Sequence, residues 1–133
     1  MKFVILLAAL VLPATASATP TGVFVARWAA ASRVAKPAGS TATAEQTLAT
    51  PELKALLDEF ATVAGDYRRQ VIEARAAGKP PRACPPKNVE LTIDDVLAEI
   101  RRLPPAWQSR DFAESFGAVM DKRYPCTAGS SVS

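Results

Sequence analysis

Cys84 and Cys126 are the two side chains of this sequence that could most readily react. A cysteine nucleophile must be ionised, which requires a base or a cationic neighbour, and the chain contains no histidine at all. In an oxidising compartment, two cysteines most simply form one disulfide. Closing a loop of about 40 residues in this way contributes on the order of 4 kcal/mol. We therefore predict a structural Cys84–Cys126 disulfide, with a pair of reactive thiols as the alternative.

Other side chains that could take part in catalysis or metal binding have simpler structural explanations. Asp94 and Asp95 are adjacent, so on a helix they diverge by about 100° and cannot converge on one substrate or metal ion. Capping and the helix dipole explain both. Ser115 has neither a histidine partner nor the strand-turn-helix surroundings of a serine nucleophile. The six glycines form no phosphate-binding loop, so we predict no enzyme activity, no cofactor and no metal.

Trp107 is the single residue that we propose as a partner-binding anchor. It follows Pro104 and Pro105 in a turn between two predicted helices. An aromatic ring held by prolines is a good interface anchor, because little conformational freedom is lost when it binds. The alternative is that the ring folds back over one end of the core. The sequence leaves both interpretations open.

The first 18 residues have the pattern of a secretory signal peptide. Lys2 precedes ten apolar residues from Phe3 to Leu12, which is too short a run for a membrane-spanning helix of about 20 residues. Small residues allow cleavage after Ala16 or Ala18. We expect cleavage near Ala18, a periplasmic location and no stable membrane insertion, with an uncleaved anchor as the alternative.

The distribution of charge argues against a nucleic-acid partner. The chain has 16 basic and 13 acidic residues and a formal net charge of +3, but the two signs interleave. No block of like charge and no basic helix face with interleaved aromatic residues is present, so we expect no nucleic-acid binding. A protein partner fits better, and a homodimer stays open.

The spacing of apolar residues predicts four helices and no sheet. The expected ranges are 21–34, 51–77, 93–103 and 109–123. Thr21 and Thr50 are available as N-caps, Gly78 suits the left-handed residue after a helix, and Thr92 with Asp95 forms a capping-box pattern. The predicted fold is an all-α, small four-helix bundle after a cleaved signal peptide, with one disulfide that clamps the last two helices.

The apolar stripes of these helices should form a single core, because each is too narrow to be stable in water alone. They comprise Val23, Phe24, Trp28, Ala31 and Val34; Leu53, Leu56, Leu57, Phe60, Val63, Ala64, Tyr67 and Val71; Ile93, Val96, Leu97, Ile100 and Leu103; and Phe112, Phe116, Val119 and Met120. The expected division is 1–18 signal peptide, 19–49 short N-terminal helix and linker, 50–126 helical domain, and 127–133 disordered tail.

A motif order in the C-terminal half suggests a family. CPP stands at 84–86, LT opens a predicted helix at 91–92, PP forms a turn at 104–105, and YPC stands at 124–126. Over about residues 83–126 this order resembles the Rap/Tai immunity family, exported helical proteins that neutralise type VI secretion peptidoglycan amidases. The resemblance implies a non-catalytic, exported immunity-type protein that binds and inhibits a peptidoglycan amidase.

Two other functions stay open beside amidase inhibition. One is a housekeeping periplasmic or envelope-binding helical protein on the same fold. The other is a small periplasmic chaperone, although the absence of histidine weighs against a switch near neutral pH. A peptidoglycan amidase encoded beside this gene would favour inhibition.

Overall fold

The computed structural model describes residues 18–35 and 50–127. These residues form four α-helices and a short 3-10 helix: α1 (Thr21–Ala35), α3 (Pro51–Ala76), α4 (Ile93–Ile100), η1 (Pro105–Ser109) and α5 (Phe112–Arg123). No strand forms among them, so the predicted all-α bundle is confirmed. Residues 1–17 of the predicted signal peptide (1–18), the predicted linker at 36–49 and residues 128–133 of the predicted tail (127–133) lie outside the described residues. None of the described helices is long and apolar enough to span a membrane.

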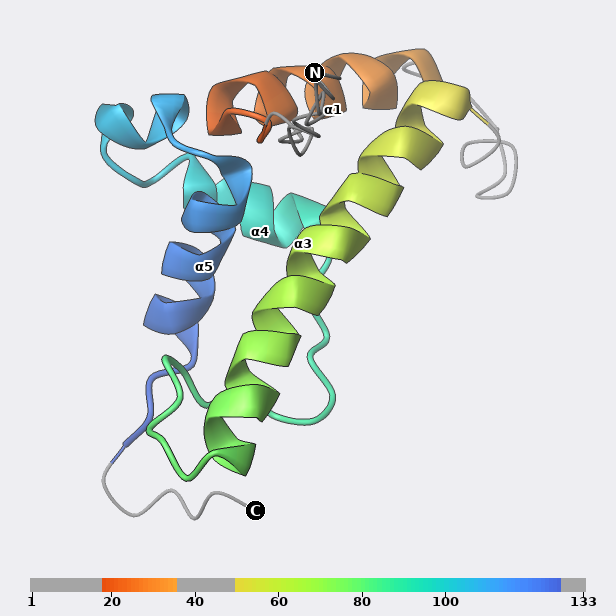
Figure 1. The fold of residues 1–133 in the computed structure, drawn as a ribbon. Coiled ribbons are helices and arrows are strands. Elements are labelled where there is room, and N and C mark those ends of the chain that lie inside the picture. Colours follow the sequence, from red (N-terminus) through yellow and green to blue (C-terminus); the bar gives the residue numbers. More distant parts are fainter. Residues whose placement is uncertain (1–17, 36–49, 128–133) are drawn as a thin grey trace, which may run out of the picture.

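The helices pack around one hydrophobic core. Figure 1 shows α1 lying across one end of the molecule, over the start of α3 and beside η1, while α5 descends alongside α3. The core residues come from every α-helix and from the segment between α3 and α4. They are Phe24, Ala31, Leu53, Leu56, Tyr67, Val71, Ala83, Val96, Leu97, Ile100, Phe112, Phe116, Val119 and Met120.

Helix α3 follows its local sequence signals closely. Pro51 occupies the first helical position, where its missing N–H costs nothing. The helix ends at Ala76, and Gly78 then adopts a φ of 67°, the left-handed conformation expected after a helix. Thr50 takes the N-cap position, but its side chain makes no capping hydrogen bond.

Helix α4 has the predicted capping box. The Asp95 N–H donates to Thr92 Oγ1 at 3.1 Å, and the Thr92 N–H donates to Asp95 Oδ2 at 3.0 Å. The helix ends at Ile100, earlier than the predicted residue 103. Residues 101–103 tighten into a turn, in which the Leu103 N–H bonds to the Ile100 carbonyl at 3.0 Å. The cause is Pro104, because a proline disfavours helical geometry in the residue before it.

Helix α5 begins at Phe112, later than the predicted start near Ser109. Residues 105–109 form η1 instead, and Arg110 is extended. The Arg110 carbonyl accepts from the Thr21 N–H at 2.8 Å, and the Phe112 N–H donates to the Thr19 carbonyl at 2.8 Å. These bonds to the N-terminal segment hold the backbone extended just where a continuous helix would have passed.

Helix α1 differs from its predicted pattern in two respects. Thr21 is not its N-cap, because the helix begins at Thr21 and the hydroxyl bonds to other elements. Val23 and Val34 are 47% and 74% exposed and belong to no core stripe. Phe24 is buried as predicted and stacks on Phe112 with 3.9 Å between ring centroids. Trp28, also predicted to be core, is partly buried against the core.

The predicted disulfide between Cys84 and Cys126 is present. Cys84 lies in the connection between α3 and α4, and Cys126 lies just beyond α5. A backbone hydrogen bond of 2.8 Å from the Cys84 N–H to the Tyr124 carbonyl lies beside the disulfide. The disulfide therefore fastens the start of the segment that leads into α4 to the end of α5.

Candidate functional site

Trp107 lies on η1 and is half-buried, outside the buried core. The guanidinium of Arg110 stacks over its ring, 4.1 Å from the ring centroid. Such a cation–π contact restrains the ring and leaves part of it accessible. Trp107 is thus partly exposed, and it is not among the residues that form the core or pack against it.

The short helix that carries Trp107 is held firmly against α1. A Cβ atom on Gly22 would lie 3.2 Å from the Gln108 side-chain oxygen and 3.3 Å from the Gln108 carbonyl oxygen, so a larger residue would fit here only if Gln108 moved back slightly. The Thr21 hydroxyl donates to the Arg110 carbonyl at 2.9 Å. The backbone that directly follows Trp107 is therefore fixed against α1, which lowers the entropy cost of binding a partner.

A groove of about 370 Å³ runs from Trp107 along α5. Its lining is about equally polar and apolar and includes Gln70, Arg82, Trp107, Arg110, Glu114 and Asp121. Both signs of charge are present, as are an aromatic ring and an amide. We call this surface the Trp107 groove. A polar rim around a fixed aromatic ring is the composition expected of a protein-binding surface.

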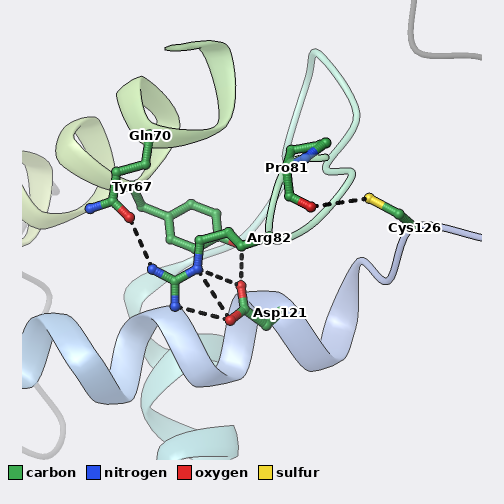
Figure 2. A network of polar contacts seen from close by, with 6 residues as sticks. All are labelled: Tyr67, Gln70, Pro81, Arg82, Asp121 and Cys126. Carbon is green, nitrogen blue, oxygen red and sulfur yellow. Dashed lines mark hydrogen bonds and ion pairs between the residues drawn. The ribbon is translucent and has the colours of Figure 1, made fainter. Parts of the chain in front are cut away.

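Three residues that line the Trp107 groove, Gln70, Arg82 and Asp121, belong to one hydrogen-bonded network, which Figure 2 shows. Arg82 binds Asp121 through two nitrogens, with 2.9 Å from Nε to Oδ1 and 2.9 Å from Nη2 to Oδ2. Arg82 Nη1 also donates to Gln70 Oε1 at 3.0 Å. The Tyr67 hydroxyl donates to Asp121 Oδ1 at 2.8 Å. The network links α3, the α3–α4 connection and α5.

The environment of this network keeps its tyrosine protonated. Burial, followed by the hydrogen bond to Asp121, raises the pKa of Tyr67 well above its usual value. The pKa of Arg82 is also raised, chiefly by its hydrogen bonds to Asp121. Tyr67 is therefore neutral and Arg82 charged at any physiological pH.

The other residues considered for chemistry have structural roles. Ser115 is fully buried, and its Oγ lies 2.6 Å from Thr21 Oγ1. Asp94 accepts a hydrogen bond of 2.9 Å from Trp28 Nε1, and Asp95 belongs to the capping box. Among the residues that the structure describes, no group of three side chains could hold a metal ion.

Sequence reasoning did not anticipate Arg82 or Asp121. They are 39 residues apart, and neither belongs to a recognisable motif. The only available signal was that Arg82 lies two residues before Cys84, so a disulfide to Cys126 would bring it near the end of α5.

Comparisons with protein-family models, with curated proteins and with solved structures found no match to this chain.

Proposed function

We propose that this protein is a non-catalytic, exported immunity-type protein that binds and inhibits a peptidoglycan amidase. The observation that carries the proposal is the braced, half-exposed Trp107 beside a mixed-charge groove. The resemblance of residues 83–126 to the Rap/Tai family supplies the class of partner. Export to the periplasm, where peptidoglycan is cleaved, is part of the same proposal.

Inhibition by such a protein needs no chemistry of its own. A rigid surface that covers the cleft of an enzyme excludes its substrate, and rigidity limits the entropy lost on binding. The Trp107 groove is rigid at both ends. Gly22 and Thr21 fix η1 at one end, and the Arg82–Asp121 network fixes the other. We place the amidase over this groove, with the Trp107 ring as its central anchor.

Truncation of the anchor tests the binding surface. Trp107→Ala should weaken binding to the amidase by about 2 kcal/mol or more, or roughly 30-fold, as expected of an aromatic hot spot. Val34→Ala is the matched control, because Val34 is an exposed apolar residue that does not line the groove. Titration calorimetry measures both affinities, and circular dichroism checks that helicity is unchanged. Equal affinities for the two variants would show that Trp107 is not part of the interface.

Co-export tests the activity itself. The amidase encoded nearest to this gene is exported to the periplasm with and without the protein, and lysis is followed by culture density. We expect lysis to be suppressed by the wild type and restored by Trp107→Ala. Equal lysis with and without the wild-type protein, with both proteins shown to be expressed, would reject inhibition of that amidase and favour a housekeeping envelope-binding role.

A further inference from the structure

A second hollow lies on the other side of α5 and shares no lining residue with the Trp107 groove. It has a volume of about 450 Å³ and lies between α3, the segment that follows Cys84, α4 and α5. Most of its wall is apolar and includes Phe60, Val71, Val89, Leu91, Phe116 and Met120. Its size lies within the range of about 300–1,000 Å³ that is typical of small-molecule sites.

The charged groups that line this apolar pocket are all cationic. Arg68 and Arg75 come from α3 and Lys87 from the opposite wall, and no aspartate or glutamate lines the pocket. None of the three cations forms an ion pair with a described residue, whereas Arg69, next to Arg68 in sequence, pairs with Asp66 at 3.1 Å. An apolar cavity with unpaired cations on two sides is complementary to an apolar ligand that carries negative charge.

Arg75 gives the clearest indication of a ligand. Its Nε atom is buried and has no hydrogen-bond partner within the described part of the chain. A buried N–H of a charged group that lacks a partner is costly, and a carboxylate is the best acceptor for a guanidinium because it binds through two parallel hydrogen bonds. Because this Nε atom is covered by its neighbours, the pocket offers an anionic head group the positive charge of the Arg75 side chain and not a bond to that atom.

Ile72 marks the open side of the pocket. It is 54% exposed although it is a large apolar residue, and it lines the pocket. Arg68 and Arg75 lie four residues before it and three residues after it on α3, so all three share one helix face. An amphiphile with an anionic head group would cover this exposed apolar surface and place its charge beside the flanking cations.

We propose that the apolar pocket binds a long-chain fatty acid. Its hydrocarbon chain lies against the partly exposed apolar wall of Phe60, Val89 and Leu91, where the hydrophobic effect drives binding. Its carboxylate lies against Arg68, Arg75 and Lys87. A folded protein partner fits the pocket less well, because a standard interface buries roughly 800 Å² on each side, more than a hollow of this size presents.

Titration of the oxidised, mature protein with dodecanoate below its micelle concentration tests the assignment. Dodecanoate should bind, and dodecanol should bind at least about tenfold more weakly because it lacks the charge. Dodecyltrimethylammonium, which carries the opposite charge on the same chain, should show no binding. The measurement needs no amidase, so its result is independent of the proposed inhibition.

Two variants and a matched control locate the site. Ile72→Gln and Arg75→Gln should each weaken dodecanoate binding by about tenfold or more. Ile72 is exposed, so its substitution leaves the core intact. Arg69→Gln removes the same charge from the same helix outside the pocket and should leave the affinity unchanged. Circular dichroism confirms that each variant is folded.

Three outcomes would overturn the proposal. One is the absence of dodecanoate binding up to about 1 mM, the weak end of measurable affinity. Another is an equal loss of affinity in Arg69→Gln and Arg75→Gln, which would indicate a non-specific electrostatic effect. The third is tighter binding of an acidic, amphipathic peptide than of dodecanoate at the same residues, which would make the pocket a docking site for protein.

Discussion

The buried hydroxyl pair of Thr21 and Ser115 is the most consequential contact between individual residues. Both side chains are fully buried, and the two oxygens lie 2.6 Å apart although the residues are 94 positions apart in sequence. Thr21 Oγ1 also bonds to the Arg110 carbonyl, which already accepts from the Thr21 N–H. The Thr21 hydroxyl thus has a second partner in the Arg110 carbonyl, whereas the Ser115 hydroxyl bonds to Thr21.

Thr21→Val should lower the free energy of unfolding by about 1–3 kcal/mol, because the Ser115 hydroxyl is left buried without its partner. Adding Ser115→Ala should recover part of this loss, since both ends of the bond are then removed. Thr62→Val, at an exposed hydroxyl on α3, should change stability by less than about 0.5 kcal/mol. Urea unfolding measures the wild type, Thr21→Val, Ser115→Ala, the double variant and Thr62→Val. Losses that add fully in the double variant would show that the two hydroxyls are not coupled.

Two helical glycines have opposite surroundings and allow a matched test. A Cβ on Gly65 would meet nothing within 4 Å, whereas a Cβ on Gly117 would lie 2.6 Å from Arg82 Nη2. Alanine in a helix is favoured over glycine by about 1 kcal/mol. Gly65→Ala should therefore stabilise the protein by up to about that amount.

Gly117→Ala should stabilise the protein less than Gly65→Ala, or should destabilise it, because the new methyl group displaces Arg82 from its position beside Asp121. Thermal unfolding compares the two variants. An equal rise in melting temperature for both would mean that the Arg82–Asp121 contact contributes nothing to stability.

At the scale of secondary-structure elements, α4 depends on the capping of its ends more than the longer helices do. It has eight residues, and isolated helices of this length are unstable in water. Its capping box satisfies free N–H groups at the first turn. The hydrogen bonds from Thr92, from its backbone first and its side chain second, lower the pKa of Asp95 below its usual 3.8.

The lowered pKa of Asp95 predicts a pH dependence. A carboxylate whose pKa is lower in the folded state stabilises the fold at pH values above its unfolded pKa, and this contribution is lost as the pH falls through the folded value. Acidification from about pH 5 to pH 2 should therefore reduce stability less in Asp95→Asn than in the wild type. Urea unfolding at a series of pH values measures this. Parallel profiles for the two proteins would contradict the role of Asp95.

At the scale of the whole molecule, α5 is held at both ends. At its start, the Phe112 N–H bonds to the Thr19 carbonyl, and the Phe112 ring stacks on Phe24. Just beyond its end, Cys126 forms the disulfide to Cys84. The N-terminal helix and the α3–α4 connection are thus both joined to α5, and one core includes residues from both ends of the described chain.

The disulfide should contribute a large share of total stability. It joins residues 42 positions apart, so its loss frees a long loop in the unfolded state. Cys84→Ser and Cys126→Ser should each lower the free energy of unfolding by roughly 2–5 kcal/mol, and the double variant should cost little more than either. Guanidinium unfolding measures the three variants. Substantially greater loss in the double variant would mean that each cysteine stabilises the fold independently of the other.

The sequence by itself determined the features that depend on neighbouring residues. Pro51 and Gly78 bounded α3, and Thr92 with Asp95 began α4, because capping and left-handed turns act within a few positions along the chain. The disulfide also followed from the sequence, since two cysteines in one chain have a single intramolecular pairing.

Features that join residues far apart in the sequence were decided only by the tertiary structure. The start of α5 moved to Phe112 because Thr19 and Thr21 bond to the backbone around Arg110. The position of Trp107 depends on the packing of η1 against α1, where Gly22 approaches Gln108. The Arg82–Asp121 network and the cation-lined pocket also join segments far apart in the chain. Such contacts depend on how the helices pack against one another. The apolar spacing within one helix does not specify which residues of other elements will contact it.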